Sequence, residues 1–239
     1  MDVIVNADDF GMNHNVNLAI DYCFKKNIIS STTIMANMPG FDEAVKLACI
    51  GKYDKYVGIH FNLVEGVPLS YSIKYCNRIC KNGKFIYKHN SILFWSKREK
   101  KAIREEFITQ IEVCRSKGIL LSHCDSHCHI HSELPMFFIM YKILKQYGIK
   151  RIRIPLNYGN NSSLLKKIYK FVFVQILHFL GFTTTSYFSS LYTPINLDSD
   201  KWIELMCHPS MRGNSLYDHV EGVMIKKQPF KMKNYTQLL

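Results

Sequence analysis

Short apolar runs alternate along the chain with longer stretches in which apolar residues recur every three or four positions. The short runs predict strands, and the longer stretches predict helices with one apolar face. The first strand is expected from Val3 to just before Asp8, and the others at 30–37, 57–63, 119–124, 151–154 and 203–207. Helices are expected at 14–27, 41–49, 100–116, 136–147 and 163–180. This alternation predicts a parallel sheet, open or closed into a barrel.

A chain of 239 residues suits one α/β domain, and 47% hydrophobic residues are ample for its core. Since no internal repeat or linker interrupts the pattern, we expect a single domain over 1–239. Two segments fall outside the alternation. Residues 70–99 are irregular and lysine-rich and are expected to form a lobe over the site, and the tail after 213 has too little periodicity to assign.

The net charge of +12 comes from lysines spread along the whole chain. Because they do not gather in one arm or helix, a solvated basic surface is favoured over a nucleic-acid site. The eight cysteines are interpreted as free thiols, and the lone C-x3-C of Cys76 and Cys80 lacks the second pair of a zinc site. The N-terminus does not resemble a secretory leader, so a cytoplasmic protein is expected.

Polar clusters recur where the expected strands end. Asp8 and Asp9 follow the first strand, His60 lies in the third, residues 125–131 follow the fourth, and His208 follows the last. The carboxyl ends of parallel strands meet at one edge of the sheet, where ligands of α/β folds bind. We therefore expect these side chains to share one site.

The densest cluster is HCDSHCHIH at 123–131. In an extended segment, alternate residues point the same way, which would turn His127, His129 and His131 toward one side. Imidazoles with a carboxylate are ligands for zinc, manganese or iron, and they suit magnesium when water completes the shell. The cluster therefore predicts a metal site.

Asp8 and Asp9 place two like charges side by side at the end of a buried strand, which is costly unless something offsets them. A divalent cation bound by one aspartate would relieve the repulsion. The other aspartate could then act as a base beside water whose pKa the ion lowers. The alternative is that one aspartate caps the following helix, but a cap needs only one.

Four motifs strongly resemble those of the YdjC-like carbohydrate deacetylases, the chitooligosaccharide deacetylase group. They are NADDFG at 6–11, GIHFNLVEGVPL at 58–69, DSHCHIH at 125–131 and MCHP at 206–209, and weaker matches are STT at 31–33, NGKF at 82–85 and RIP at 153–155. All occur in the family's order across residues 1 to about 212. Residues 70–99 and the tail after His208 depart from the family's pattern.

The resemblance implies a TIM-barrel-like parallel β/α barrel, distorted or incomplete, that forms a homodimer. It also implies hydrolysis of the N-acetyl group of an amino sugar or oligosaccharide with one divalent metal ion, Mg²⁺ or Zn²⁺. Carried over by motif, the metal ligands are Asp9, His60 and His127.

The same comparison implies a role for residues around the metal. Asp8 becomes the candidate base, His208 the candidate acid that protonates the leaving amine, and Arg153 the group that orients the base. Residues assigned to substrate binding are Asn6, His129 and His131.

Two other functions are compatible with parts of the pattern. An amidohydrolase- or phosphoesterase-type metal hydrolase would use the HIH of 129–131 as its metal pair, but this reading leaves NADDFG unexplained. A non-catalytic metal- or sugar-binding module would have no need of His208.

Residues 163–182, SLLKKIYKFVFVQILHFLGF, combine lysines with a long apolar run. The run is too short and too interrupted for a membrane span, which needs roughly 20 mostly apolar residues. A buried helix, packed on the sheet or against a second subunit, is favoured. The alternative is a helix on a membrane surface, with peripheral membrane contact and a lipid-linked amino sugar as substrate.

Overall fold

The computed structural model describes residues 1–89, 92–159, 162–196 and 200–238. Its main sheet has the strand order β6-β3-β2-β1-β8-β7, and every neighbouring pair is parallel. These strands are β1 (Asp2–Phe10), β2 (Ser31–Ile34), β3 (Val57–Phe61), β6 (Cys124–Ser126), β7 (Tyr187–Ser190) and β8 (Trp202–Cys207). The carboxyl ends of all six strands therefore lie at one edge of the sheet.

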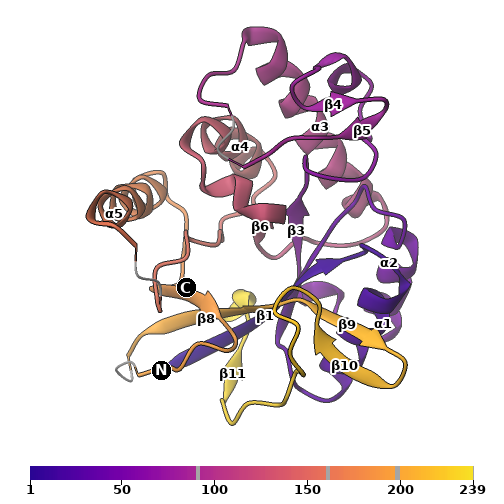
Figure 1. The fold of residues 1–239 in the computed structure, drawn as a ribbon, viewed down its shortest axis with the longest axis vertical. Coiled ribbons are helices and arrows are strands. Elements are labelled where there is room, and N and C mark those ends of the chain that lie inside the picture. The colour runs from indigo at the N-terminus through magenta and orange to yellow at the C-terminus, as the bar shows by residue number, and fades with distance from the viewer. Residues whose placement is uncertain (90–91, 160–161, 197–199, 239) are drawn as a thin grey trace.

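In the described parts of the chain, five α-helices connect or follow the strands and lie around the outside of the sheet (Figure 1). They are α1 (His14–Lys25), α2 (Phe41–Ile50), α3 (Lys97–Ser116), α4 (Leu134–Gln146) and α5 (Leu164–Phe179). All five helices were predicted to within a few residues. α3 begins three residues earlier than expected because Ser96 and Glu99 form a capping box at its N-terminus.

The sheet forms a half-barrel that single-residue bridges extend beyond β6. Ile152 pairs with Cys124, and Arg151 pairs with Thr183, where a complete barrel would have full strands. The predicted TIM-barrel-like α/β fold, in its incomplete form, is confirmed. One apolar cluster runs through the strands and the faces of the helices that cover them.

β1 lies near the middle of the sheet, between β2 and β8. Val3, Ile4 and Val5 are at most 1% exposed, as expected for a strand that is covered on both faces. Each such side chain contributes about 1.5–3 kcal/mol when fully buried. This burial fixes the position of the two aspartates at the end of the strand.

β1 continues past Asp8 to Phe10, and the strand predicted at 30–37 covers only Ser31–Ile34. Two other strands differ more from their predicted extent. The strand predicted at 119–124 begins only at Cys124, because Leu121 has a φ of 55°, which an extended strand does not accommodate. The strand predicted at 151–154 is reduced to isolated bridges, and Pro155, which has no backbone N–H, follows it. β7 was not predicted.

The segment 70–99 is irregular as expected, although residues 90–91 lie outside the described part. Its described residues contain one short helical turn, η2 (Ser72–Tyr75), and two short strands, β4 (Cys80–Lys81) and β5 (Lys84–Phe85). Ile73, Ile79 and Phe85 are buried, and η2 packs on α3. The segment is a packed extension beside α3 (Figure 1).

The tail after 213, which could not be assigned from the sequence, completes the fold in two places. β9 (Pro209–Arg212) and β10 (Ser215–Asp218) form an antiparallel hairpin beyond β8. β11 (Met232–Lys233) adds to the N-terminal half of β1, and η4 (Tyr235–Gln237) follows it. The ring of Tyr235 stacks on His123 with centroids 3.8 Å apart.

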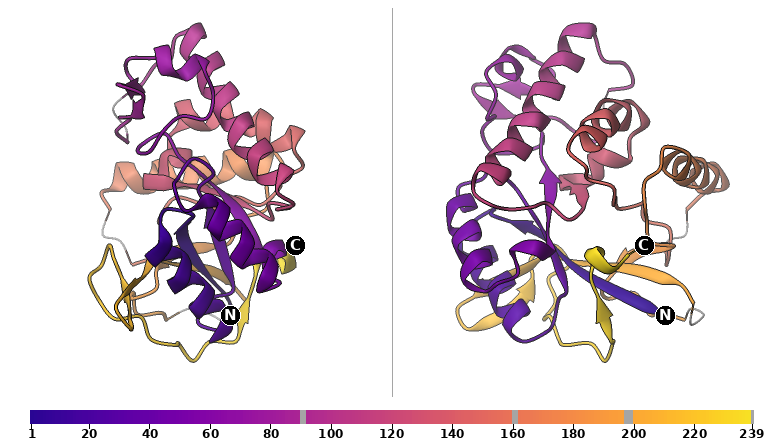
Figure 2. Two further views of the ribbon diagram at one scale, coloured as in Figure 1. Left: turned by 90° about the vertical axis from the view of Figure 1, so that its right-hand side faces the viewer. Right: turned by 180° about the vertical axis from the view of Figure 1, so that it is seen from behind.

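α5 is the least covered of the five helices. Only Phe173 and Leu177 are buried on it, so the predicted packing on the body of the protein holds for one face alone. In the view from behind (Figure 2, right) it stands apart at the upper right of the molecule. Within the described parts of the chain, every helix is too short or too polar to cross a bilayer.

Candidate active site

The sequence predicted that Asp8 and Asp9 follow the first strand. Both instead lie within the last residues of β1, which ends at Phe10. The register of β1 against β2 shifts between Ala7 and Phe10, and Asp9 has a left-handed φ of 68°. This bulge interrupts the alternation of side chains, so both carboxylates line the same cavity. Neither aspartate caps the following helix, because Asn13 accepts the hydrogen bond from Val16 N at its start.

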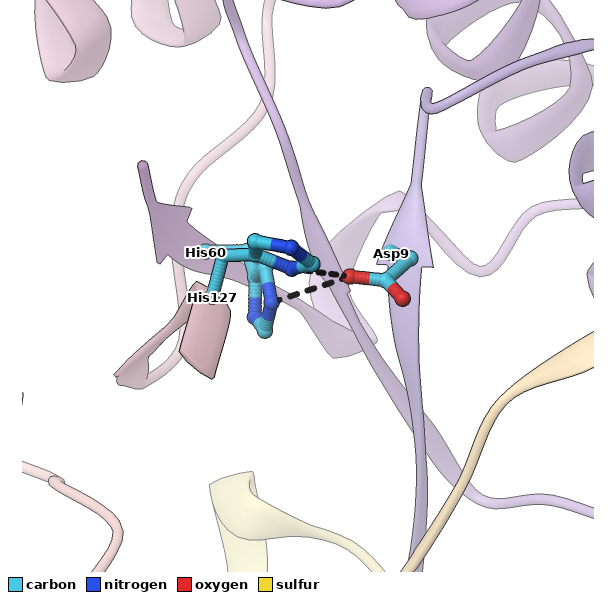
Figure 3. A group of neighbouring side chains, drawn as sticks. All are labelled: Asp9, His60 and His127. Carbon is cyan, nitrogen blue, oxygen red and sulfur yellow. Dashed lines mark hydrogen bonds and ion pairs between the residues drawn. The ribbon is translucent and has the colours of Figure 1, made fainter. Parts of the chain in front are cut away.

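Asp9, His60 and His127 point toward one another from β1, β3 and the segment after β6 (Figure 3). Asp9 Oδ1 lies 3.2 Å from His60 Nε2 and 2.9 Å from His127 Nδ1. Two ligand atoms bound at about 2.1 Å to one tetrahedral or octahedral ion are about 3.0–3.4 Å apart. The three predicted ligands therefore fit a divalent metal in chemistry, and Asp9 lies at the expected spacing from both histidines.

Each of the two imidazoles is held from its far side by a carboxylate. His60 Nδ1 is 2.6 Å from Asp125 Oδ1, and His127 Nε2 is 2.9 Å from Glu65 Oε1. A carboxylate behind a histidine fixes the tautomer and leaves the other ring nitrogen free to bind a metal. Neither Asp125 nor Glu65 was assigned a role from the sequence, although both lie within the recognised motifs.

The carboxylates around His60 and His127 favour positive charge on the two imidazoles. Burial disfavours protonation of His60, but Asp125 and Asp9 outweigh it and raise the pKa of His60 to about 10. Burial likewise opposes protonation of His127, but hydrogen bonds to Asp9 and other neighbours raise its pKa to about 12. The carboxylates thus hold protons on both imidazoles, and a divalent ion could replace those protons.

A second group of possible ligands is Asp8, His60 and Asp125. It is less suited to a metal, because Asp8 and Asp125 already share a buried guanidinium. Arg153 Nη1 lies 2.7 Å from Asp8 Oδ2 and 2.8 Å from Asp125 Oδ2. The Asp9 group is therefore the candidate metal centre.

Arg153 is fully buried and contacts three carboxylates. Its Nη1 and Nη2 donate to Asp8 Oδ2 and Oδ1 at 2.7 and 2.6 Å, which makes a bidentate pair. Nη2 also lies 2.6 Å from Glu204 Oε1. Its guanidinium carbon lies 4.7 Å from the centre of the Phe188 ring. Arg153 thus lies where the predicted orientation of Asp8 requires it.

Asp8 is ionised through its partners. Burial alone would raise the pKa of its carboxyl group, but Arg153 outweighs burial and holds the pKa far below its usual value. Asn6 Nδ2 also donates to Asp8 Oδ1 at 2.9 Å. Asp8 is therefore always available to accept a proton, although a low pKa makes it a weak base.

His208 follows β8 and stands across the cavity from the metal group. Its Nε2 is 4.0 Å from Asp8 Oδ2, and its Nδ1 is 3.6 Å from Asp218 Oδ1. Burial lowers the pKa of His208, but Asp218 and the two site aspartates outweigh burial and raise it above its usual value. A raised pKa favours the protonated ring, which suits the predicted role of an acid.

Two further residues of the site come from the tail. Asp218 accepts a hydrogen bond from the backbone N–H of His208 at 2.8 Å, and His219 Nε2 lies 3.5 Å from Asp9 Oδ2. Both were missed, because nothing in the periodicity of the tail indicated that it returns to the site.

The segment after β6 is not extended, so the expectation that three alternate histidines face one side is wrong. Residues His127–Ser132 form a short 3₁₀ segment in which Cys128 and His129 have positive φ angles. His127 turns toward Asp9, whereas His131 is fully buried with its Nδ1 2.6 Å from Ser126 Oγ.

The site opens into a cavity of about 430 Å³. His129, assigned to substrate binding, lines it together with Asp8, Asp9 and His208. Asn6 and His131, assigned the same role, are fully buried behind the wall and contact Asp8 and Ser126. Their contact with substrate stays a prediction. In the structure both residues contact other residues of the site and not the open cavity.

Known proteins resemble the chain over most of its length. A carbohydrate deacetylase from Clostridium beijerinckii is 34% identical over 217 residues, covering 87% of this chain and 81% of that protein. A carbohydrate deacetylase from Halalkalibacterium halodurans is 29% identical, covering 100% of this chain and 97% of that protein. These relatives are similar to the chain on both sides of the irregular segment.

A solved structure from Enterococcus faecalis, named "putative cellobiose-phosphate cleavage protein", superposes with a TM-score of 0.69 over 89% of this chain and 82% of that one. At 21% identity it shows a shared fold and nothing more. The family model described as YdjC-like protein matches residues 2–234. The predicted resemblance is confirmed, and the chain belongs to the YdjC-like family.

Proposed function

We propose that this chain is a metal-dependent hydrolase that removes the N-acetyl group from an acetylated amino sugar or oligosaccharide of the chitooligosaccharide type. The names of its relatives bear out the predicted carbohydrate N-deacetylase. The observation that carries the metal-dependent reaction is the grouping of Asp9, His60 and His127 beside an ionised Asp8, with a protonatable His208 across the same cavity.

Asp9, His60 and His127 would hold the ion. A bound divalent metal supplies Lewis acidity and lowers the pKa of water at the site. Asp8, fixed by both nitrogens of Arg153, accepts the proton of a water molecule as that water attacks the acetamide carbonyl carbon. Because the metal lowers the pKa of water, a weak base such as Asp8 suffices.

His208 would complete the reaction on the other side of the carbonyl. An amine leaves poorly unless its nitrogen is protonated, so a donor must reach that nitrogen as the C–N bond breaks. Asp218 holds the backbone of His208 and favours its charged ring. The two products are then acetate and the free amino sugar.

The alternative metal hydrolase that uses the histidines of 129–131 has less support. The rings of His129 and His131 lie 6.1 Å apart, and His131 is buried against Ser126. Among the residues that the structure describes, the groups that could hold a metal include neither of these two histidines. A non-catalytic binding module would need no proton donor, so it would not account for a His208 that is held by Asp218.

One experiment separates these functions. Acetate release from diacetylchitobiose and phosphate release from p-nitrophenyl phosphate are measured on one preparation that has been loaded with Zn²⁺ or Mg²⁺. The proposal predicts acetate without phosphate. Phosphate release alone would support the phosphoesterase, and no release of either product with metal and sugar bound would support a binding module.

Replacing His208 should affect an amide far more than an activated ester. His208→Ala removes the proton donor, so acetate release from diacetylchitobiose should fall by about 10²–10⁴. Hydrolysis of p-nitrophenyl acetate should change little, because nitrophenolate leaves without a proton. His178→Ala, at an exposed histidine on α5, is the control. Equal losses on the two substrates would assign His208 to structure or substrate binding.

A further inference from the structure

The outer face of α5 is apolar and exposed, although the rest of the helix is held against the body of the protein. Positions 164, 168, 171, 172 and 179 share one face by helical spacing. The exposed fractions on this outer face are 73% for Leu164, 51% for Ile168, 65% for Phe171, 44% for Val172 and 89% for Phe179. Leu165 beside them is 79% exposed. Gln175 and His178 are also exposed on this face, between Val172 and Phe179. An exposed face that carries this many large apolar side chains marks an interaction surface.

The charges on α5 are all of one sign. The helix carries Lys166, Lys167 and Lys170, and it has no acidic residue from Leu164 to Phe179. Interfacial helices combine an apolar face with lysines that reach lipid headgroups. The excess of lysine over the whole chain, with a net charge of +12, favours the same kind of partner.

α5 also borders the active site. A cleft of about 490 Å³ is lined by Lys166, Tyr169 and Lys170 on one side and by Cys128 and His129 on the other. Cys128 and His129 also line the catalytic cavity, so the two spaces adjoin. A group held at the lysines would therefore lie next to the reacting centre.

We propose that the outer face of α5 binds the surface of an anionic membrane, and that the enzyme takes acetylated amino sugars from lipids in that surface. The proposed lipid-linked substrate rests on the proposed deacetylase function, whereas the proposed membrane contact does not. The apolar side chains enter the headgroup boundary, Lys167 meets anionic headgroups, and Lys166 and Lys170 face the cleft that leads to the active site.

A second copy of the chain fits this face less well. In a twofold contact the same patch meets itself, which would bring α5 of one protomer against α5 of the other. Lys167 of each helix would then lie at or near the contact, with no acidic residue on either helix to neutralise it. The predicted homodimer stays a prediction, with its interface elsewhere on the surface.

The test is co-sedimentation at physiological salt with vesicles of phosphatidylcholine alone or mixed equally with phosphatidylglycerol. The wild type should bind the mixed vesicles and stay in the supernatant with phosphatidylcholine alone. Phe171→Asp and Phe179→Asp should each weaken partitioning by about tenfold or more, because each removes a large apolar group from the contact. Both residues are exposed, so the variants should fold.

Ile50→Asp is the matched control. Ile50 is 78% exposed and ends α2 as Phe179 ends α5, and α2 lies on the opposite side of the molecule in Figure 1. It adds the same charge, so it should leave vesicle binding unchanged. An equal loss in this variant would overturn the proposal, since binding would then follow net charge alone.

Two further results would overturn the membrane contact. One is a wild type that stays in solution with both kinds of vesicle. The other is a dimer in solution, seen by sedimentation equilibrium, that Phe171→Asp converts to monomers, because a second copy would then cover α5.

Substrate is tested by acetate release from an N-acetylglucosaminyl phospholipid in the mixed vesicles and from diacetylchitobiose in solution. Faster release from the lipid, lost in Phe171→Asp, is expected. Release from the soluble sugar alone would overturn the proposed lipid-linked substrate and would leave the proposed deacetylase function standing. Vesicle binding without acetate from either would instead contradict the deacetylase.

Discussion

Asp8→Asn should keep the metal and lose turnover by about 10²–10⁴. An amide cannot accept the proton of the attacking water, but it has nearly the same shape as the carboxylate. The metal ligands Asp9, His60 and His127 are not changed, and Arg153 keeps its contacts with Asp125 and Glu204. Metal content is measured on the same preparation as acetate release from diacetylchitobiose.

Asp21→Asn is the control for this variant. Asp21 is also a buried aspartate, but it lies on α1 and contacts Lys25 and Tyr53 away from the site. Its replacement should leave acetate release unchanged. If Asp8→Asn also loses the metal, Asp8 is a ligand and the division of roles between the two aspartates is wrong.

Arg153→Met should lower the free energy of unfolding by about 3–5 kcal/mol, a large part of the 5–15 kcal/mol typical of a domain. The change leaves Asp8, Asp125 and Glu204 buried without their shared cation. Methionine fills part of the same space, so the loss reflects charge more than volume. Urea unfolding at neutral pH measures it.

Arg98→Met is the control for the stability measurement on Arg153→Met. Arg98 is exposed on α3, and its replacement should change the free energy of unfolding by no more than about 0.5 kcal/mol. Equal and small losses for the two variants would mean that the carboxylates around Arg153 are not ionised in the folded protein. The role of Arg153 in fixing Asp8 would then have no basis.

The place of the site could be predicted from the sequence because a parallel sheet brings its strand ends together, whereas the choice of Asp9, His60 and His127 as ligands came from the resemblance to the family. Asp9, His60 and His208 are far apart in the chain, but each lies at or directly after the carboxyl end of a strand of the same parallel sheet. Apolar runs locate such strands well enough to show that polar residues after them meet. The exact residue at which a strand ends was less accessible, since the bulge at Asp9 depends on local φ angles.

The supporting residues could not be derived in the same way. The role of His131 depended on whether 127–131 is extended, and the positive φ angles of Cys128 and His129 decide against that. Asp218 and His219 reach the site through a hairpin formed by β9 and β10. A short antiparallel hairpin in a polar tail leaves little periodic trace, so only the three-dimensional structure reveals the contact.

α5 shows a different limit of sequence patterns. Its apolar content predicted a buried helix, but burial depends on what lies opposite each face, and only Phe173 and Leu177 are buried against the body of the protein. Periodicity cannot distinguish a face that meets the core of its own chain from a face that meets another surface.

The most direct test of the central claim measures bound metal and acetate release together on the wild type, His127→Ala and His14→Ala. His127 is a proposed ligand, whereas His14 is an exposed histidine that pairs with Glu43. The wild type and His14→Ala should bind one divalent ion per chain and release acetate from diacetylchitobiose, and a chelator should abolish the release. His127→Ala should lose both by more than about 100-fold, because loss of a ligand should exceed the 10–100-fold cost of losing its support. Undiminished metal and activity in His127→Ala, or acetate release that survives removal of the metal, would contradict the account.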